Sequence, residues 1–155
     1  MLLSGIRNKQ QQDEYGCLVV CCQMILGYLG IDKDEEWLWK QLRAGSITPF
    51  SKVQNLATDL GLVVERSSWQ DDLRLFEPYI ESGLPVIVAV DADHTAYWPY
   101  YRDHAVIVIG FDEAHVFVND PAQAEAPLAV DIGTFLLAWA NRDYEYAVIR
   151  LAEDS

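Results

Sequence analysis

One stretch of the sequence, residues 17–29, is apolar around almost its whole circumference when it is drawn as a helix. Apolar residues recur at i, i+3, i+4, i+7 and i+8 from Cys17, and most positions between them are apolar too. A helix of this kind has to be covered on nearly all sides, so the stretch predicts the centre of a core. Gly30 is a natural residue for its C-terminal end.

The rest of the sequence predicts further helices first and strands afterwards. Helices are expected over 33–43, 51–60 and 73–82, with a short strand over 62–65. Apolar, β-branched runs at 85–90, 105–111 and 116–118 predict buried strands, and a helix capped by Asp131 then precedes a last strand over 146–151. Helices followed by a mainly antiparallel sheet are the α+β pattern. We expect one such domain over residues 1–155.

The charge balance excludes some functions. The chain has 24 acidic and 11 basic residues, a formal net charge of −13. Phosphate binding needs clustered Lys and Arg, so no nucleic-acid partner is expected. The acidic surface is compatible with a basic peptide or protein substrate, although it is more often a solubility feature. Without a long apolar span or a secretory signal at its start, the sequence predicts a cytoplasmic protein with no membrane span.

The three cysteines, Cys17, Cys21 and Cys22, lie within six residues. An odd, local set is a poor disulfide framework, and because the histidines lie far downstream a structural zinc site is only a weak alternative. No metal or other cofactor is expected. Cys21 and Cys22 fall inside the predicted helix and are predicted core residues. Cys17 opens that helix after Gly16, where backbone N–H groups and the helix dipole favour a thiolate. Its alternative is a small buried apolar residue, as most free cysteines are.

His104 begins a predicted strand and is the candidate general base. If the following hairpin turns near Glu113, paired residue numbers sum to about 226, and Asp120 becomes a diagonal neighbour of His104 on one sheet face. A carboxylate there could orient the imidazole. A one-residue shift would separate the two. Asn119 stays an alternative, whereas Asp103 is a poorer one because adjacent strand side chains point to opposite faces.

The sequence leaves open the roles of several other residues near these positions. A side-chain amide just before Cys17 could donate to an oxyanion beside the Cys17 N–H. His94 and His115, in a loop and a turn, are expected to be solvated, and Phe135 and Trp139 are expected in the core. The loop 91–103 could line a substrate groove or merely cover the sheet edge with its aromatic residues Tyr97, Trp98, Tyr100 and Tyr101.

Four motifs occur in order across nearly the whole chain. They are Gln11…Gly16-Cys17…Met24-Ile-Leu…Tyr28-Leu-Gly30, then Gly83-Leu-Pro85-Val-Ile-Val, then His104-Ala-Val-Ile-Val-Ile-Gly110-Phe-Asp112, and Val118-Asn-Asp120-Pro121. Together, at these spacings, they resemble the C39-like peptidases, a bacterial branch of the papain-like cysteine peptidases. The resemblance implies a papain-like fold, with an N-terminal helical part packed on a C-terminal, mainly antiparallel sheet.

The resemblance also implies a site and a reaction. Cys17 would be the nucleophile, His104 the base and acid, and Asp120 the residue that orients His104. Gln11, six residues before Cys17, would be the oxyanion donor, with Gln10 and Gln12 as neighbouring alternatives. The implied reaction is amide hydrolysis through a Cys17 thioester.

Two other functions stay open. One is acyl transfer of the transglutaminase type, and the other is a catalytically silent, peptidase-like binding domain. Relatives that cleave after a double glycine are often fused to a transporter, and these residues include no such part. Leader-peptide cleavage during export is therefore not expected.

Overall fold

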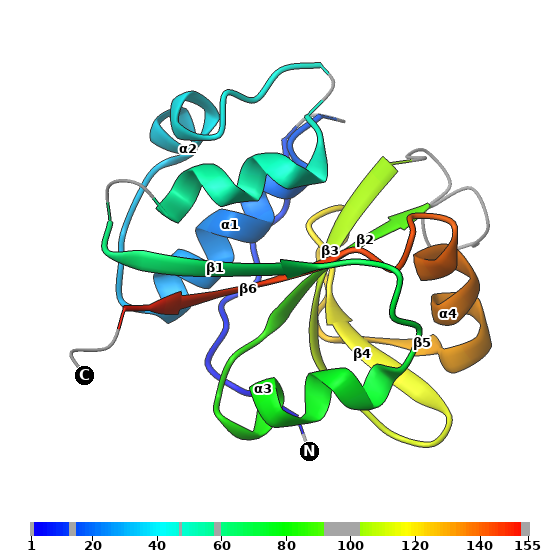
Figure 1. Ribbon diagram of the computed structural model, residues 1–155. Coiled ribbons are helices and arrows are strands. Elements are labelled where there is room, and N and C mark those ends of the chain that lie inside the picture. Colours follow the sequence, from blue (N-terminus) through cyan, green and yellow to red (C-terminus); the bar gives the residue numbers. More distant parts are fainter. Residues whose placement is uncertain (1, 13–14, 47, 58–59, 92–102, 153–155) are drawn as a thin grey trace.

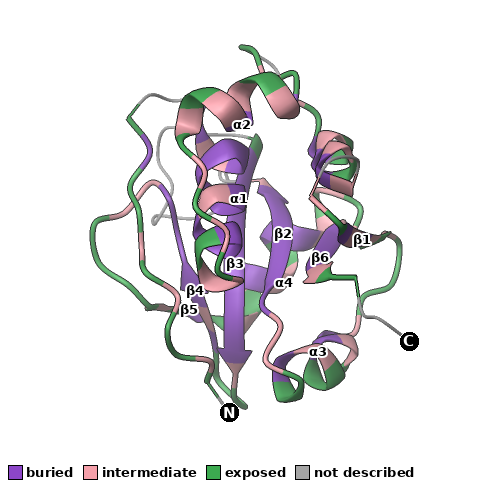
Figure 2. Cartoon of the chain, turned by 90° about the vertical axis from the view of Figure 1, so that its left-hand side faces the viewer, coloured by how far each residue is buried: buried purple, intermediate pink, exposed green. Residues whose placement is uncertain are grey.

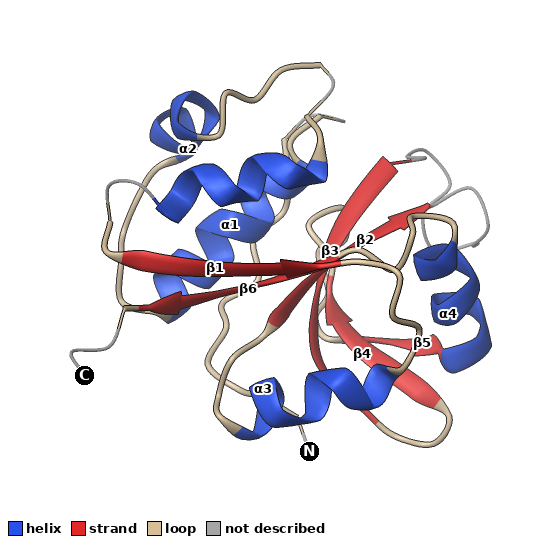
Figure 3. Cartoon of the chain, viewed as in Figure 1, coloured by secondary structure: helices blue, strands red, loops and turns tan. Residues whose placement is uncertain are grey.

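The centre of the fold is a six-stranded sheet of order β1-β6-β2-β3-β4-β5, in which every neighbouring pair is antiparallel (Figure 3). The computed structural model describes residues 2–12, 15–46, 48–57, 60–91 and 103–152. The strands are β1 (Leu62–Ser67), β2 (Val86–Asp91), β3 (Asp103–Phe111), β4 (His115–Asn119), β5 (Leu128–Asp131) and β6 (Tyr146–Leu151).

Helices cover both faces of this sheet (Figure 1). One face packs against α1 (Cys17–Tyr28) and the 3-10 helix η1 (Phe50–Ala57), and α2 (Glu35–Gln41) packs against α1. The other packs against the 3-10 helix η2 (Leu73–Phe76) with α3 (Glu77–Glu81) and α4 (Ile132–Ala140). The predicted α+β class with an antiparallel sheet is confirmed.

Strand β2 shows how the sheet serves both cores. Ile87 and Ala89 belong to the core on the α1 side, whereas Val86, Val88 and Val90 belong to the core on the α4 side. This is the period-two alternation of a strand that is buried on both faces. Figure 2 shows β2 and β3 as almost continuously buried ribbons.

Helix α1 begins at Cys17 as predicted and ends one residue before the expected Leu29. Its buried residues run from Leu18 to Leu26 with one exception, Gln23, so the helix is covered on nearly all sides. Gly30 follows with φ +87°, a left-handed conformation that favours glycine at a helix end.

The next three helices differ from the prediction in length, type or continuity. The helix expected over 33–43 covers only Glu35–Gln41, because Asp34 accepts a hydrogen bond from the Trp37 N–H and fixes the N-terminal end. The helix expected over 51–60 is the 3-10 helix η1. The one expected over 73–82 is divided into η2 and α3, and Pro78, which has no N–H to donate, lies at the start of α3.

The C-terminal third contains one strand that the sequence did not predict. Strand β5 has only four residues and no alternating pattern of its own, and it forms by pairing with β4. The helix after it was predicted correctly, since Asp131 caps α4 by accepting a hydrogen bond from the Thr134 N–H at 3.0 Å. Phe135 and Trp139 are fully buried, as expected.

The hairpin of β3 and β4 has two registers. Ile107 pairs with Asn119 and Val108 with Val118, which is the predicted sum of 226. A bulge between Val108 and Gly110 shifts the remaining pairs by one residue toward the tip. The predicted register is therefore confirmed for the half of the hairpin that leads to His104 and Asp120.

Candidate active site

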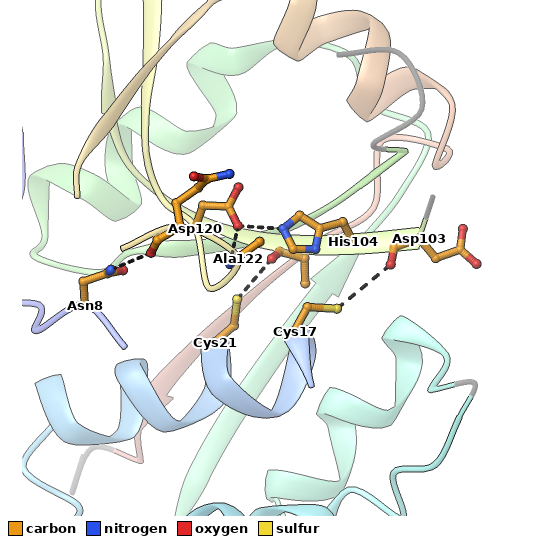
Figure 4. A network of polar contacts seen from close by, with 9 residues as sticks. Asn8, Cys17, Cys21, Asp103, His104, Asp120 and Ala122 are labelled. Atoms are coloured by element: carbon orange, nitrogen blue, oxygen red, sulfur yellow. Dashed lines mark hydrogen bonds and ion pairs between the residues drawn. The ribbon is translucent and has the colours of Figure 1, made fainter. Parts of the chain in front are cut away.

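The thiol of Cys17 lies at the N-terminal end of α1, next to the start of β3 (Figure 4). Cys17 is partly exposed, and its Sγ atom contacts the backbone oxygen of Asp103 at 4.0 Å. As the first residue of a helix, it presents one of the N–H groups that have no acceptor within the helix. A nucleophile and an oxyanion donor can therefore come from the same residue.

His104 and Asp120 are in direct contact. The Nε2 atom of His104 lies 2.7 Å from the Oδ1 atom of Asp120, and both side chains are fully buried. The same Oδ1 atom accepts a hydrogen bond from the Ala122 N–H at 2.8 Å, which fixes the carboxylate. Asn119, the alternative partner, is also buried, but the contact with the imidazole is made by Asp120.

The protonation of His104 is set by opposing effects. Burial lowers its pKa, but hydrogen bonds with Asp120 and Cys17 and the charges of these two groups raise it more, to about 9. These effects favour the protonated form of the imidazole, which lies against the carboxylate of Asp120 and near the thiol of Cys17.

Gln11 differs from its two neighbours in burial. Gln11 is 8 % exposed, whereas Gln10 and Gln12 are exposed. Its backbone N–H donates to the Pro121 carbonyl at 2.7 Å, directly beside Asp120. Of the three amides, Gln11 is the one held against the part of the fold that carries the candidate site.

A pocket opens beside Cys17, and one ion pair in its wall was not foreseen. Arg142, just after α4, donates to Asp103 with Nη1 3.0 Å from Oδ1. No local pattern signals this pair, because the two residues come from distant parts of the sequence. Asp103 therefore points away from the Asp120 side, as the strand alternation predicted. The lining residues are Cys17, Leu18, Thr48, Phe50, Ala89, Asp103, His104, Ala105 and Arg142.

The two other cysteines lie in the core, as predicted. Cys21 and Cys22 are fully buried and unbridged, and burial raises the pKa of both thiols. Cys21 donates a hydrogen bond to the Ala105 carbonyl at 3.4 Å. Neither thiol faces solvent, which leaves Cys17 as the accessible one.

The remaining histidines lie apart from this site or outside the described residues. His115 begins β4 with its side chain 47 % exposed, as expected for a solvated residue. His94 and the aromatic residues Tyr97, Trp98, Tyr100 and Tyr101 lie outside the described residues. Within the described part of the chain, no group of His, Cys, Asp and Glu could hold a metal ion. Nor does any helix there have the length and apolarity to cross a membrane.

Similar proteins are found among sequence families and among solved structures. The sequence matches the Peptidase_C39 like family over residues 4–147. A structure described as a C39-like peptidase from Bacillus anthracis is similar, with TM-score 0.78 and 20 % identity over 96 % of each chain. The peptidase domain of Streptococcus ComA, a bifunctional ABC transporter of a quorum-sensing pathway, gives TM-score 0.73 and 18 % identity, covering 97 % of this chain and 100 % of that one.

A third similar structure is a double glycine motif protease from an AMS/PCAT transporter, solved in complex with the leader peptide. It gives TM-score 0.69 and 14 % identity, covering 95 % of this chain and 92 % of that one. No curated protein matches the sequence. At these identities the likeness shows the fold, and the predicted papain-like fold is confirmed.

Proposed function

Since the chain belongs to the Peptidase_C39 like family, we propose that it is a cysteine peptidase that cleaves peptide bonds through a thioester on Cys17. His104 acts as base and acid, Asp120 orients His104, and Gln11 donates to the oxyanion. The observation that carries the proposal is the buried contact between His104 and Asp120, next to a partly exposed thiol at a helix N-terminus.

The reaction begins with the proton of the Cys17 thiol. Asp120 occupies the Nε2 atom of His104, which leaves Nδ1 to exchange the proton with Cys17. Because the pKa of His104 is raised to about 9, the imidazole is basic enough to keep the proton that it takes from the sulfur, and the thiolate formed in this step is the nucleophile. Asp120 stabilises the imidazolium and keeps its ring in place.

Bond cleavage then follows in two halves. The Cys17 sulfur attacks the amide carbonyl carbon, and the oxygen takes up negative charge that the Cys17 N–H and the Gln11 side chain stabilise. Collapse breaks the C–N bond, His104 protonates the leaving amine, and a thioester remains on Cys17. Neutral His104 then takes a proton from water, which attacks the thioester and releases the acid.

The substrate is proposed to be a peptide or protein. One solved structure with the same fold holds a leader peptide. The net charge of −13 favours substrates with basic residues around the scissile bond through long-range attraction. That preference predicts a rate that falls as salt is added.

Thiol labelling tests the nucleophile without knowledge of the substrate. Iodoacetamide at neutral pH should alkylate Cys17 far faster than Cys21 or Cys22, because only Cys17 is both accessible and paired with His104. In His104→Ala this advantage should be lost. Slow labelling of all three thiols at similar rates would instead favour a silent binding domain.

A peptide mixture then tests the reaction. Wild-type protein should cleave peptides and Cys17→Ala should not, with products identified by mass spectrometry. Adding a primary amine separates the outcomes, because a hydrolase yields free acid whereas an acyltransferase yields the new amide. Predominant amide formation at low amine concentration would contradict the hydrolase.

A further inference from the structure

The segment that carries Gln11 is tied to the turn that follows Asp120. The Asn8 side chain donates from Nδ2 to the Gln123 carbonyl at 3.1 Å and lies 3.4 Å from the Ala124 carbonyl. The Gln11 N–H donates to the Pro121 carbonyl at 2.7 Å. Asn8 and Gln123 are 115 positions apart in the sequence, and Figure 4 shows Asn8 beside the Asp120 turn.

The Asp120 turn and the segment that carries Gln11 differ in the bonds that fix their positions. The turn is fixed by its own bonds, from the Ala122 N–H to the Asp120 carboxylate at 2.8 Å and from the Gln123 N–H to the Asp120 carbonyl at 3.0 Å. Residues 3–12 contain neither helix nor strand. A segment without regular structure depends more on individual side-chain bonds for its position. Loss of the Asn8 bonds should therefore displace the Gln11 segment more than the Asp120 turn.

We propose that Asn8 is a positioning residue that holds the Gln11 amide where it can donate to the oxyanion, with the Asp120 turn as its anchor. The inference rests on the proposed function, because it assumes that Gln11 is the oxyanion donor. It assigns to Asn8 no contact with the substrate. A small displacement of a donor is enough to weaken transition-state stabilisation, since that stabilisation depends on a pre-set geometry.

Two small reagents distinguish a role of Asn8 in oxyanion stabilisation from a general effect on the reactivity of the Cys17 thiol. In acylation by p-nitrophenyl acetate, the Cys17 sulfur bonds to the carbonyl carbon, an oxyanion forms, and p-nitrophenolate leaves. In alkylation by iodoacetamide, the sulfur displaces iodide from a methylene carbon and no oxyanion forms. Both reactions need a thiolate, but only acylation needs Gln11.

The test compares both rates in Asn8→Ala, with Cys17→Ala as the blank. We expect acylation to fall about tenfold while alkylation stays within about twofold of wild type. Asn8→Asp keeps the side-chain shape but places a carboxylate against carbonyl oxygens. It should likewise slow acylation and leave alkylation nearly unchanged. Asn55→Ala is the matched control, because Asn55 makes the same type of bond, to the Leu42 carbonyl at 3.3 Å. Both rates should be unchanged in this control, and its melting temperature shows what loss of such a bond does to stability alone.

A double variant tests whether Asn8 acts through Gln11. If Asn8 acts through Gln11, then Asn8→Ala combined with Gln11→Ala should acylate no more slowly than Gln11→Ala alone. Multiplied losses in the double variant, or equal losses of acylation and alkylation in Asn8→Ala, would overturn the role of Asn8. Acylation that responds to Gln11→Ala but not to Asn8→Ala would overturn it too, while leaving the proposed function intact. If wild-type Cys17 reacts no faster than the blank with either reagent, the proposed function fails and this inference fails with it.

Discussion

The imidazole of His104 and the carboxylate of Asp120 meet at 2.7 Å, with neither side chain exposed. One comes from the start of β3 and the other from the residue after β4, so the hairpin itself brings them together. Their burial excludes water from the contact, and the interaction is stronger there than at the surface. The hairpin is therefore both a structural element and the support of the candidate base.

Replacing the carboxylate should impair the base without removing it. Asp120→Asn keeps the shape but loses the charge, so the pKa of His104 should fall and the correct ring tautomer should be less favoured. We expect kcat for peptide cleavage to fall roughly a hundredfold. Asp112→Asn, which changes an exposed carboxylate at the tip of the same hairpin, should retain wild-type kcat. Equal activity of the two variants would contradict the assigned role of Asp120.

Stability should fall as pH rises above neutrality. The pKa of His104 is about 9 in the folded chain against 6.5 for the ordinary group, so both folded and unfolded chains are protonated below about pH 6.5 and the stabilisation is complete. Above that pH only the folded chain keeps the proton, and the contribution is lost as pH approaches about 9. Between about pH 6.5 and pH 8 we expect a loss of about 2 kcal/mol in the free energy of unfolding, measured by urea titration.

The pH range of the stability loss also distinguishes the effect of His104 from that of the buried thiols. Burial raises the pKa of Cys21 and Cys22, which lowers stability with rising pH only above the ordinary thiol value of about 8.5. Asp120→Asn should therefore flatten the fall below about pH 8 and leave the fall above it. A wild-type stability that is constant from about pH 6.5 to pH 8 would contradict the assigned ionisation of His104.

The three amides before Cys17 should differ in their effect on catalysis. Gln11→Ala should lower kcat about a hundredfold, the size expected when one oxyanion donor is removed, with little change in KM. Gln10→Ala and Gln12→Ala should have little effect, because both side chains are exposed. Steady-state kinetics on one cleaved peptide checks all three. A larger loss in Gln10→Ala or Gln12→Ala than in Gln11→Ala would move the donor to the neighbouring position.

The two core cysteines should respond differently to serine. Cys22→Ser places a hydroxyl in an apolar core and should destabilise the fold by about 2 kcal/mol. Cys21→Ser should cost about 1 kcal/mol, because serine can replace the hydrogen bond that Cys21 donates to Ala105. Urea unfolding of both variants measures the difference. A larger loss of stability in Cys21→Ser than in Cys22→Ser would mean that the hydrogen bond of Cys21 contributes nothing to stability.

Local signals predicted the parts of the fold that local interactions create. Helix α1 and the Asp131 cap were predicted because their patterns lie within a few residues, and the register near His104 because a turn position determines it. Strand β5 was missed because its structure comes from pairing with β4. The papain-like fold itself was expected from a resemblance of motifs, not from periodicity.

The candidate site likewise contains residues that local patterns predicted and contacts that they could not predict. The predicted helix start indicated Cys17, and the predicted hairpin indicated His104 and Asp120, from the sequence alone. The Arg142–Asp103 ion pair and the Asn8 contacts could not be predicted, because they join distant segments through single side chains. The resemblance pointed to Gln11 by its spacing to Cys17, whereas the burial that separates it from Gln10 and Gln12 is a property of the folded chain.

The bulge between Val108 and Gly110 divides the β3–β4 hairpin into a part next to the site and a part next to its tip. A change of length at the tip, around Asp112–Ala114, can be accommodated by the pairs beyond the bulge, without a slip in the pairs that lead to His104 and Asp120. The tip is thus the place to insert an affinity tag or a fluorescent probe, and the location where natural variants can differ in loop length while keeping the same chemistry.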